Sequence, residues 1–377
     1  MKKYAIQSIP PGSFFTKPVY ADDAFIITGP EVTFSPQLIQ ILKNWEIKEV
    51  QSDGEPREDY AGDEETVQEA GGMDEKALLD GGEQIRDAEK FYNEFLRYTR
   101  DLFYQMAVGR EIPFPQVAQR IKELCGIVKN HRRYLLRITR RDVSQEENYL
   151  AFHTVKSTII AIIIGGYIKL PPPRLIELGV AALLHEIGMI LLSPETYLNN
   201  RPLSPEERKR IAGHPILGYN LLKSLNYPLA VSLGALEHHE RENGAGYPQR
   251  LRGDTISLYA KIIAVTCSYE ALTSARPYKD AKDGYTGMLD LLKNEGRQYD
   301  ETIVKALVYT LSIYPIGLYV LLSSGKKGQV VDVNPEFPKF PMVQVFGELS
   351  PNGKNKIIQT SPEGIYIARP LRKEEIG

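Results

Sequence analysis

Five of the six histidines in the sequence fall within a stretch of fewer than ninety residues: His153, His185, His214, His238 and His239. Imidazole nitrogens and carboxylate oxygens are side-chain atoms that bind divalent transition metals, and a carboxylate, Glu186, directly follows the second histidine. A lone histidine on a helix is more often a structural residue. A histidine on each of several apolar helices, together with a His-His pair, favours a site for one or two metal ions instead.

The local sequence around Glu186 suggests how such a site is built. His185 follows an apolar run that ends in Leu183-Leu184, so it is expected on a core-facing helix. A buried carboxylate at Glu186 is costly unless a cation pairs with it, and a carboxylate shared between two ions meets that need. His238 and His239 point about 100° apart on a helix. They can therefore converge on one ion only near a helix end, which the glycine-rich loop after Arg241 supplies.

Helical periodicity predicts the elements that carry these residues. Apolar residues at spacings of three, four and seven indicate two long helices over about 85–106 and 117–138. The run Ser204-Pro205-Glu206-Glu207 is a capping box with proline at the first helical position. Further helices are predicted at about 145–167, 174–191, 204–224, 228–241, 256–274 and 300–313.

The two ends of the chain have a different character. Short apolar runs between prolines and glycines predict strands near the N-terminus, with a short helix starting at Ser35-Pro36. Hairpins are expected at Leu318–Val333 and around Pro351-Asn352-Gly353. From Glu46 to Glu75 the sequence has 12 acidic and 2 basic residues, which is typical of a flexible linker, with an acidic docking tail as the alternative. We therefore predict a mainly α protein: a mixed α/β module at 1–50, a flexible acidic linker at 51–83, connecting helices at 84–142, a helical domain at 145–325 and a β-rich tail at 326–377.

Composition narrows the class of protein. The chain has 377 residues, 42% of them hydrophobic and 25% charged, and a net charge of −2. These values fit a globular protein and give no general attraction for nucleic-acid polymers or membranes. Two cysteines, Cys125 and Cys267, cannot form a disulfide framework, and no secretory signal is evident at Met1. A cytoplasmic location is expected.

The motifs, taken together, resemble a known family. They are His153, Leu-Leu-His-Glu-Ile-Gly at 183–188, His214-Pro215 with Gly218, His238-His239-Glu240-Arg241, Gly246-Tyr247-Pro248 and Ala271–Ser274 with Arg276-Pro277-Tyr278. Their order and spacing over about 145–335 resemble the HD-GYP family, a branch of the HD-domain metal phosphohydrolases. That family hydrolyses the bacterial second messenger cyclic di-GMP. The resemblance implies an HD-type helical bundle.

The resemblance also implies roles for individual residues. One metal ion would be bound by His153, His185, Glu186 and Cys267, and a second by Glu186, His214, His238 and His239. Iron or manganese is expected, with zinc as the alternative, and His185 and Glu186 would carry the catalytic chemistry. Two adjacent ions can activate a water nucleophile and neutralise charge on phosphorus. Arg276 and Lys279 match phosphate-contacting positions, and Gly246 and Tyr247 would form a loop beside the substrate.

Four positions depart from the family pattern. Glu186 and Cys267 replace aspartates, Met189 replaces a lysine near the leaving group, and Tyr149 replaces the glutamate of three-metal members. A thiolate favours softer metals, and Cys267 can equally be an inert buried thiol. A third ion is not expected at Tyr149.

Three functional hypotheses follow. The first is a phosphodiesterase that opens cyclic di-GMP to the linear dinucleotide pGpG or to GMP. The second is a catalytically inactive receptor for cyclic di-GMP or for a protein partner, which Met189 and Cys267 motivate. The third is an HD hydrolase for another nucleotide, against which Gly246-Tyr247-Pro248 argues. A homodimer or a signalling protein partner fits either of the first two hypotheses.

Overall fold

The structure is a computed structural model. It describes residues 1–17, 19–20, 26–28, 34, 39, 42–43, 48–57, 81–138, 149–193, 196, 201, 203–274, 282–334, 336–350, 355–371 and 375, with the backbone alone for 26–28 and 81–84. The chain divides into two compact units. One contains residues 76–318 and 335–339, and the other contains residues 1–75, 319–334 and 340–377.

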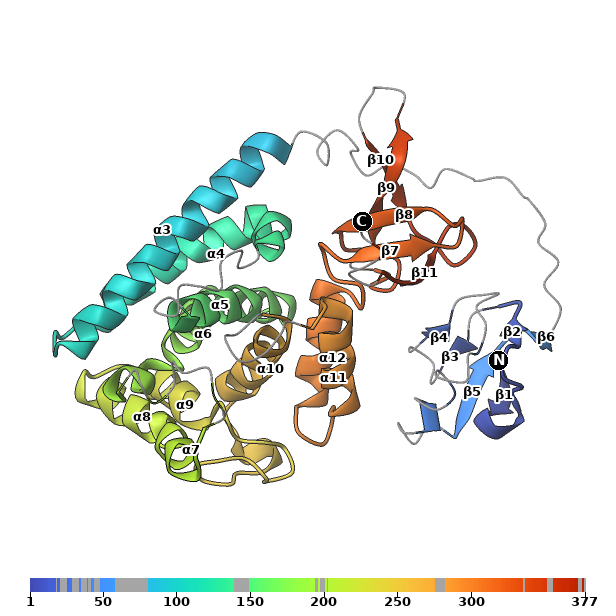
Figure 1. The fold of residues 1–377 in the computed structure, drawn as a ribbon. Helices are drawn as coiled ribbons and strands as arrows, with labels where there is room; N and C mark the ends of the chain where they lie inside the picture. Colours follow the sequence, from blue (N-terminus) through green and yellow to red (C-terminus); the bar gives the residue numbers. More distant parts are fainter. Residues whose placement is uncertain are drawn as a thin grey trace. The chain divides into compact units, whose positions relative to one another are not determined.

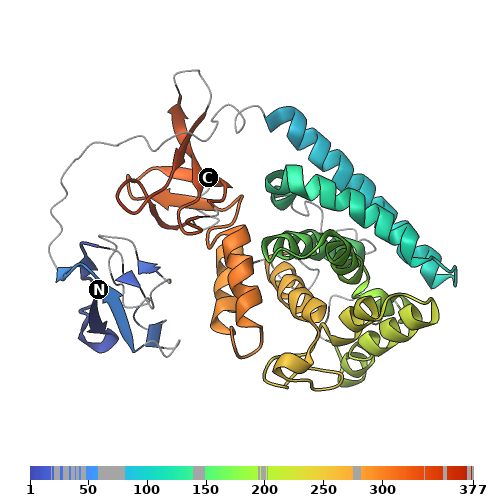
Figure 2. The ribbon, with the colours of Figure 1, turned by 180° about the vertical axis from the view of Figure 1, so that it is seen from behind.

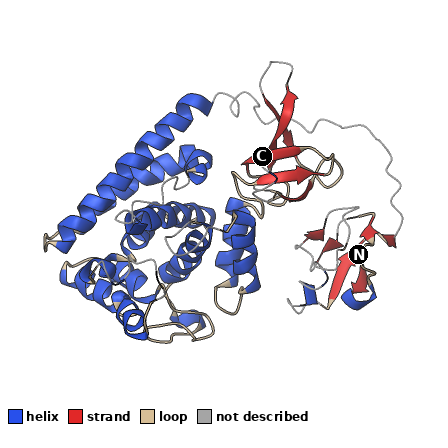
Figure 3. Cartoon of the chain, in the orientation of Figure 1, coloured by secondary structure: helices blue, strands red, loops and turns tan. Residues whose placement is uncertain are grey.

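The first unit is helical (Figures 1 and 3). Its helices are α3 (Gly81–Ala107), α4 (Phe114–Arg137), α5 (Tyr149–Tyr167), α6 (Pro172–Leu184), the 3-10 helix η3 (Ile187–Leu191), α7 (Pro205–Ile211), α8 (His214–Ser224), α9 (Leu229–Glu237), α10 (Leu258–Thr273), α11 (Gly284–Lys293) and α12 (Glu301–Leu311). The predicted helical bundle is therefore confirmed. The view from behind shows α3 and α4 running alongside each other (Figure 2).

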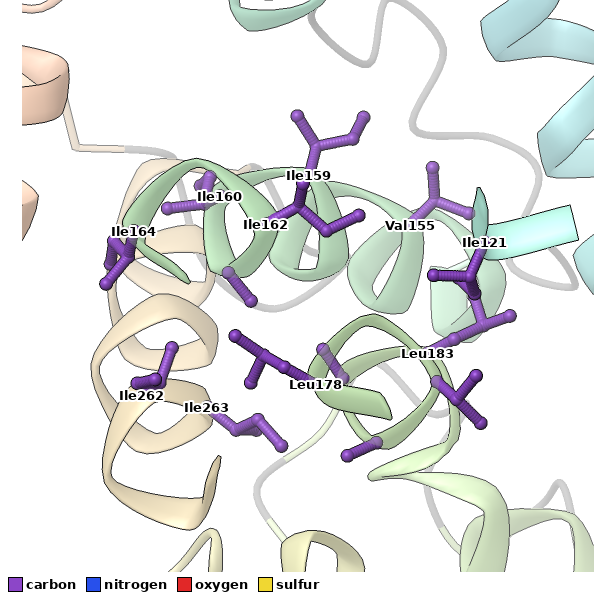
Figure 4. Packing of buried hydrophobic residues seen from close by; sticks show 14 of the residues in the cluster. Ile121, Val155, Ile159, Ile160, Ile162, Ile164, Leu178, Leu183, Ile262 and Ile263 are labelled. Carbon is purple, nitrogen blue, oxygen red and sulfur yellow. The ribbon is translucent and has the colours of Figure 1, made fainter. Parts of the chain in front are cut away.

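Helix α5 is the centre of this unit because it packs against α3, α4, α6, α10 and α12. Its side chains are apolar around most of its circumference, as expected of a helix that is covered on all sides. One buried hydrophobic cluster contains Ile159, Ile160 and Ile164 of α5, Leu178 of α6 and Ile262 of α10 (Figure 4). Burial of each such side chain contributes about 1.5–3 kcal/mol to folding. This packing fixes the relative positions of three helices that carry site residues.

The composition of α5 would also suit a membrane span. Helix α5 is long and apolar enough to cross a bilayer, but 78% of its most apolar 18-residue window is buried inside the helical unit. This burial is typical of the core helix of a globular domain.

Two predicted helices end earlier than expected. The predicted helix at 204–224 is two helices, because Pro215 has no N–H to donate to the carbonyl of Ile211, where α7 ends. The predicted helix at 174–191 ends at Leu184, and the chain turns at Glu186 (φ −94°, ψ 8°) into η3. The capping box at Ser204 is confirmed, since its hydroxyl accepts from the Glu207 N–H at 3.2 Å.

The remaining unit contains the two β regions. Near the N-terminus, β1 (Lys2–Ala5), β5 (Glu49–Ser52), β3 (Val19–Tyr20) and β4 (Ile26–Thr28) form an antiparallel sheet in that order, and β2 (Phe14–Phe15) pairs with β6 (Pro56–Arg57). The flexible linker predicted at 51–83 is wrong at both ends. Residues 51–52 and 56–57 lie in strands, because alternate side chains of β5 face an apolar core that contains Val50, and residues 81–83 belong to α3. The rest of the predicted linker, 58–80, and the helix start at Ser35 lie outside the described residues.

The C-terminal sheet contains five antiparallel strands in the order β10-β9-β8-β7-β11. These are β7 (Tyr319–Leu322), β8 (Lys327–Asp332), β9 (Met342–Leu349), β10 (Asn355–Gln359) and β11 (Ile367–Pro370). Pairing of β7 with β8 confirms the first predicted hairpin. Strands β9 and β10 also pair, although the turn between them lies outside the described residues. The sheet begins at Tyr319, earlier than the predicted boundary at 326.

Candidate metal centre

The histidines of the centre lie at or near helix ends. His185 caps the C-terminus of α6, His214 begins α8, and His238 caps the C-terminus of α9 with His239 directly after it. His153 alone lies inside a helix, in the first half of α5. Residues at a helix end can leave the helical spacing, so the neighbouring imidazoles of His238 and His239 approach to 4.2 Å between ring centroids. The structure thus places the two imidazoles next to each other at the C-terminal end of α9.

Within the described ranges, two groups of side chains bring possible metal-ligating atoms within 4.8 Å of one another. The first contains His153, His185 and Glu186. His153 Nε2 lies 3.3 Å from His185 Nε2, and Glu186 Oε1 lies 3.8 Å and 3.9 Å from these two nitrogens. Both imidazoles are buried. The first group thus offers two nitrogens and one carboxylate oxygen.

The second group contains Glu186, His214, His238 and His239. His214 Nε2 lies 3.2 Å from His238 Nε2 and 3.2 Å from Glu186 Oε2. The Glu186 carboxylate therefore directs one oxygen to each group. This is the arrangement expected of a carboxylate that bridges two cations.

Hydrogen bonds to the backbone set the tautomer of three of these histidines. The Nδ1–H groups of His185, His214 and His238 donate to the carbonyls of Ala182, Ile211 and Ala235, respectively, at 2.7, 2.6 and 2.9 Å. A carbonyl is an acceptor only, so each Nδ1 carries the proton and each Nε2 presents a lone pair to the centre. A hydrogen bond at the outer nitrogen is the usual way in which a metal-ligating histidine is oriented.

The donor set fits divalent metal ions. His214 Nε2 and His238 Nε2 both present lone pairs at a separation of 3.2 Å, an arrangement that is repulsive unless a cation is shared. Two imidazole nitrogens at about 2.1 Å from one ion, with tetrahedral or octahedral angles, are separated by roughly 3.0–3.4 Å. The nitrogen–nitrogen separations of both groups lie in this interval.

Burial and neighbouring charges set the electrostatics of the centre. Burial lowers the pKa of His185 to about 4, and burial also holds the pKa values of His238 and His239 well below 6.5. Burial alone would raise the pKa of Glu186, but four surrounding imidazoles outweigh it and lower that pKa to about 2. At neutral pH His185, His238 and His239 are therefore neutral and Glu186 is ionised, which are the forms that bind metal.

Close backbone contacts hold the second group together. A Cβ atom at Gly188 would lie 2.6 Å from the Gly218 nitrogen and still closer to the carbonyl oxygen of His214. Only glycine allows η3 and α8 to approach this closely. A Cβ at Gly246 would lie 2.6 Å from the His239 carbonyl oxygen. The loop that contains Gly246 therefore packs against the backbone that follows His238 and His239, a pair of residues called the ligand pair below.

The loop after α9 places an aromatic ring on the centre. The Tyr247 ring stacks on His239 with centroids 4.6 Å apart and an interplanar angle of 18°. Glu240 fixes the far side of the loop, because its buried carboxylate accepts the Gln249 N–H at 2.6 Å and the Leu251 N–H at 3.0 Å. The sequence did not indicate this role for Glu240.

One predicted metal ligand, Cys267, is not in either donor group of the described residues. It is buried in α10, and its thiol donates to the Ala264 carbonyl at 3.6 Å. Burial raises the pKa of this thiol to about 12. Met189 is buried in η3. Arg276 and Lys279 lie outside the described residues.

One residue of the centre was not predicted. Glu270 is buried one turn after Cys267 on α10, and its Oε2 is hydrogen-bonded to His153 Nδ1. The available signal was an acidic residue inside an apolar helix, since a buried carboxylate requires a partner.

The helical bundle thus holds two groups of histidine and carboxylate side chains that could bind metal ions. Residues 127–303 match the family described as HD domain. The chain is 31% identical to a cyclic di-GMP phosphodiesterase of Pseudomonas aeruginosa, over 70% of this chain and 63% of that protein. It is 25% identical to a cyclic di-GMP phosphodiesterase of Borreliella burgdorferi, over 61% of this chain and 62% of that protein. The chain thus spans a little under two thirds of the length of these curated relatives.

A third relative, over a shorter part of the chain, and one solved structure are also similar to this protein. The chain is 41% identical to a cyclic di-GMP phosphodiesterase response regulator of Xanthomonas campestris, over 36% of each chain. An HD-GYP-type protein from Bdellovibrio bacteriovorus has the same fold, with a TM-score of 0.50 and 14% identity over 81% of this chain and 97% of that one. Over residues 127–303 the chain therefore resembles the HD-domain family, and its fold is similar to that of an HD-GYP-type protein.

Proposed function

We propose that this protein is a metal-dependent phosphodiesterase that hydrolyses cyclic di-GMP to pGpG, to GMP or to both, in bacterial second-messenger signalling. The observation that carries the proposal is the division of Glu186 between two donor groups, with Oε2 at 3.2 Å from His214 Nε2 and Oε1 facing His153 and His185. Phosphodiester hydrolysis is a reaction for which paired metal ions are suited. Relatives that carry the name cyclic di-GMP phosphodiesterase support the choice of substrate.

The centre takes two ions in this proposal, iron or manganese, with zinc as the alternative. Bound ions would supply Lewis-acid activation of water and neutralise negative charge on the phosphate. His153, His185 and Glu186 would hold the first ion, and Glu186, His214, His238 and His239 the second. Cys267 would join the first ion only as a thiolate, and its raised pKa opposes ionisation unless a metal displaces the proton.

The substrate would lie against the loop that follows α9. Gly246 is buried against the backbone of the ligand pair, and Tyr247 covers His239. We assign these residues to the wall of the substrate site. Arg276 and Lys279 follow Ser274, the residue that caps α10, and we assign their cationic groups to the phosphates, since arginine pairs with phosphate in a bidentate manner.

Hydrolysis adds a water oxygen to phosphorus and breaks one phosphorus–oxygen ester bond. The departing oxygen then needs a proton. The Met189 thioether cannot donate one, so the proton must come from solvent or from another group at the site. We therefore expect slower turnover than in relatives that have a lysine at this position.

Replacing the ligand pair tests the proposal. The double variant His238→Ala, His239→Ala should lose cyclic di-GMP turnover in manganese or iron, because the second donor group loses two of its four members. His131→Ala is the matched control, since His131 lies on α4 and belongs to neither donor group of the described residues. Turnover that survives the double substitution would contradict the proposal.

The alternative function is a receptor that binds cyclic di-GMP or a protein partner without turnover. The neutral thiol of Cys267 and the thioether of Met189 favour it. The variant Met189→Lys, Cys267→Asp separates the two proposals. If the wild-type protein has no turnover and the variant gains it, the receptor is supported. If the wild-type protein turns over cyclic di-GMP and the variant does so at a similar rate, the phosphodiesterase is supported.

Partners and location are part of the same proposal. A cytoplasmic location gives access to a soluble cyclic dinucleotide, and the burial of the apolar helix α5 in the helical core is consistent with it. A homodimer or a signalling protein partner would transmit the signal in either function, and no nucleic-acid polymer is required.

A further inference from the structure

A buried carboxylate lies behind the first donor group, on the side away from Glu186. Glu270 is in α10, and its side chain has no exposed surface. Its Oε2 is hydrogen-bonded to His153 Nδ1, whereas His153 Nε2 faces His185 Nε2 at 3.3 Å. The two nitrogens of His153 thus connect Glu270 to the donor group.

His153 differs from the other histidines of the centre in how it is oriented. His185, His214 and His238 each donate to a backbone carbonyl three residues earlier in their own segment. His153 is instead hydrogen-bonded to a side chain of another helix. The orientation of this imidazole therefore depends on how α5 and α10 pack, and on the identity of residue 270.

A carboxylate has a further effect that a carbonyl lacks. Its negative charge makes the opposite nitrogen of the imidazole a stronger donor to a cation. The first donor group has Glu186 as its single carboxylate, and a buried thiol occupies position 267. Glu270 lies one turn after Cys267 on α10. Its carboxylate is hydrogen-bonded to His153, so its charge can affect the first donor group through that imidazole.

Two other side chains, Lys156 and Tyr92, interact electrostatically with this carboxylate. Lys156 follows His153 by one turn on α5 and donates to the carbonyls of Leu135, Leu136 and Ile138 at 3.4, 3.2 and 2.5 Å. Tyr92 of α3 packs its ring against Phe152 with centroids 6.2 Å apart. The region behind His153 is thus closed by α3, α4 and α5, and solvent does not screen Glu270.

We propose that Glu270 is the positioning residue of the first half of the metal centre: it holds His153 with Nε2 toward the ion and supplies, through the imidazole, the second negative charge of that half-site. This inference rests on the metal-dependent function proposed above. It assigns to Glu270 no contact with the substrate or with the ion.

The tautomer of His153 tests the proposal without any metal. In metal-free protein labelled with nitrogen-15 at histidine, His153 should carry its proton on Nδ1, and the signal is assigned by its loss in His153→Gln. In Glu270→Ala this preference should disappear, while the signals of His185, His214 and His238 stay on Nδ1. A wild-type His153 protonated on Nε2 would overturn the proposal, even if every variant failed to fold.

Metal affinity provides the second test. Titration of manganese into metal-free Glu270→Gln should show a first-half-site affinity about 10–100-fold weaker than in wild type, the usual effect of removing such a partner, with the second site unchanged. Glu270→Asp, which keeps the charge, should recover part of the loss. The matched control is Glu177→Gln, which removes a carboxylate that accepts a hydrogen bond from Tyr259 of α10 at 3.1 Å and should bind manganese as wild type does.

The outcomes separate the two proposals. Equal affinities for wild type and Glu270→Gln, or an equal loss in Glu177→Gln, would overturn the role of Glu270. Absence of cyclic di-GMP turnover in a protein that shows the predicted tautomer and affinity change would overturn the phosphodiesterase and leave the role of Glu270 intact.

Discussion

Acid should destabilise the metal-free protein through histidines that fold in their neutral form. His185 has no exposed surface, and burial lowers its pKa to about 4 from the ordinary 6.5. Between pH 6.5 and 4, His185 is protonated in the unfolded chain but stays neutral in the folded chain. The stability from this group is therefore complete above pH 6.5 and is lost as the pH falls toward 4.

The size of the effect follows from these two pKa values. Through this group, the free energy of unfolding at pH 5 is about 2 kcal/mol lower than at pH 7. Below pH 4 the decrease approaches about 3 kcal/mol, because each pKa unit corresponds to about 1.36 kcal/mol. The pKa values of His238 and His239 are also lowered by burial. They add to the loss in the same direction.

Urea unfolding in the presence of a chelator, at pH 7 and at pH 5, measures this loss. His185→Gln is the informative comparison because it removes the titrating group and keeps a polar side chain of similar size. The variant should lose about 2 kcal/mol less than wild type between the two pH values. An identical pH dependence in the two proteins would refute the reasoning.

Two further predictions concern the backbone around the centre. Gly188→Ala should destabilise the fold by about 1–3 kcal/mol and weaken the second metal site, because the new Cβ would collide with the His214 backbone; unchanged urea unfolding and manganese binding would contradict this. Glu240→Gln should lower stability by about 1–3 kcal/mol and raise KM for cyclic di-GMP. Its side-chain NH2 would face the backbone N–H of either Gln249 or Leu251, and that N–H would lose its acceptor. A loss of stability with an unchanged KM would show a purely structural role.

Much of the centre was predictable because the types of its residues indicate metal binding. Five histidines in order, with Glu186 and a glycine-rich loop, indicate a metal site before any fold is known. The end of α9 was predictable for a geometric reason, since His238 and His239 cannot face one ion inside a regular helix. The structure confirms both the helix end and the close approach of the two rings.

Other features depend on tertiary packing that periodicity does not record. Glu270 is one of 48 acidic residues in the chain. Its position in an apolar helix marks it as unusual, but its contact with His153 depends on the approach of α10 to α5. Helix α11 was not predicted because it begins Gly-Tyr-Thr-Gly, a poor helix-forming sequence. Its N-terminus is stabilised by Asp283, whose carboxylate accepts the Thr286 N–H at 2.9 Å.

The strands at residues 49–57 were missed for a similar reason. Their acidic composition resembles that of a linker, but Val50 and Ser52 are buried and β5 pairs with both β1 and β3. Alternation over four residues is too short a signal to outweigh charge.

The most direct test of the central claim is metal content measured together with turnover. Protein purified without a chelating tag or added metal would be subjected to elemental analysis, and the same sample assayed with cyclic di-GMP. The account predicts about two equivalents of iron, manganese or zinc, as the two donor groups require, with conversion to pGpG or GMP. One equivalent or less, with cyclic di-GMP bound but not converted, would contradict the binuclear enzyme and identify a receptor.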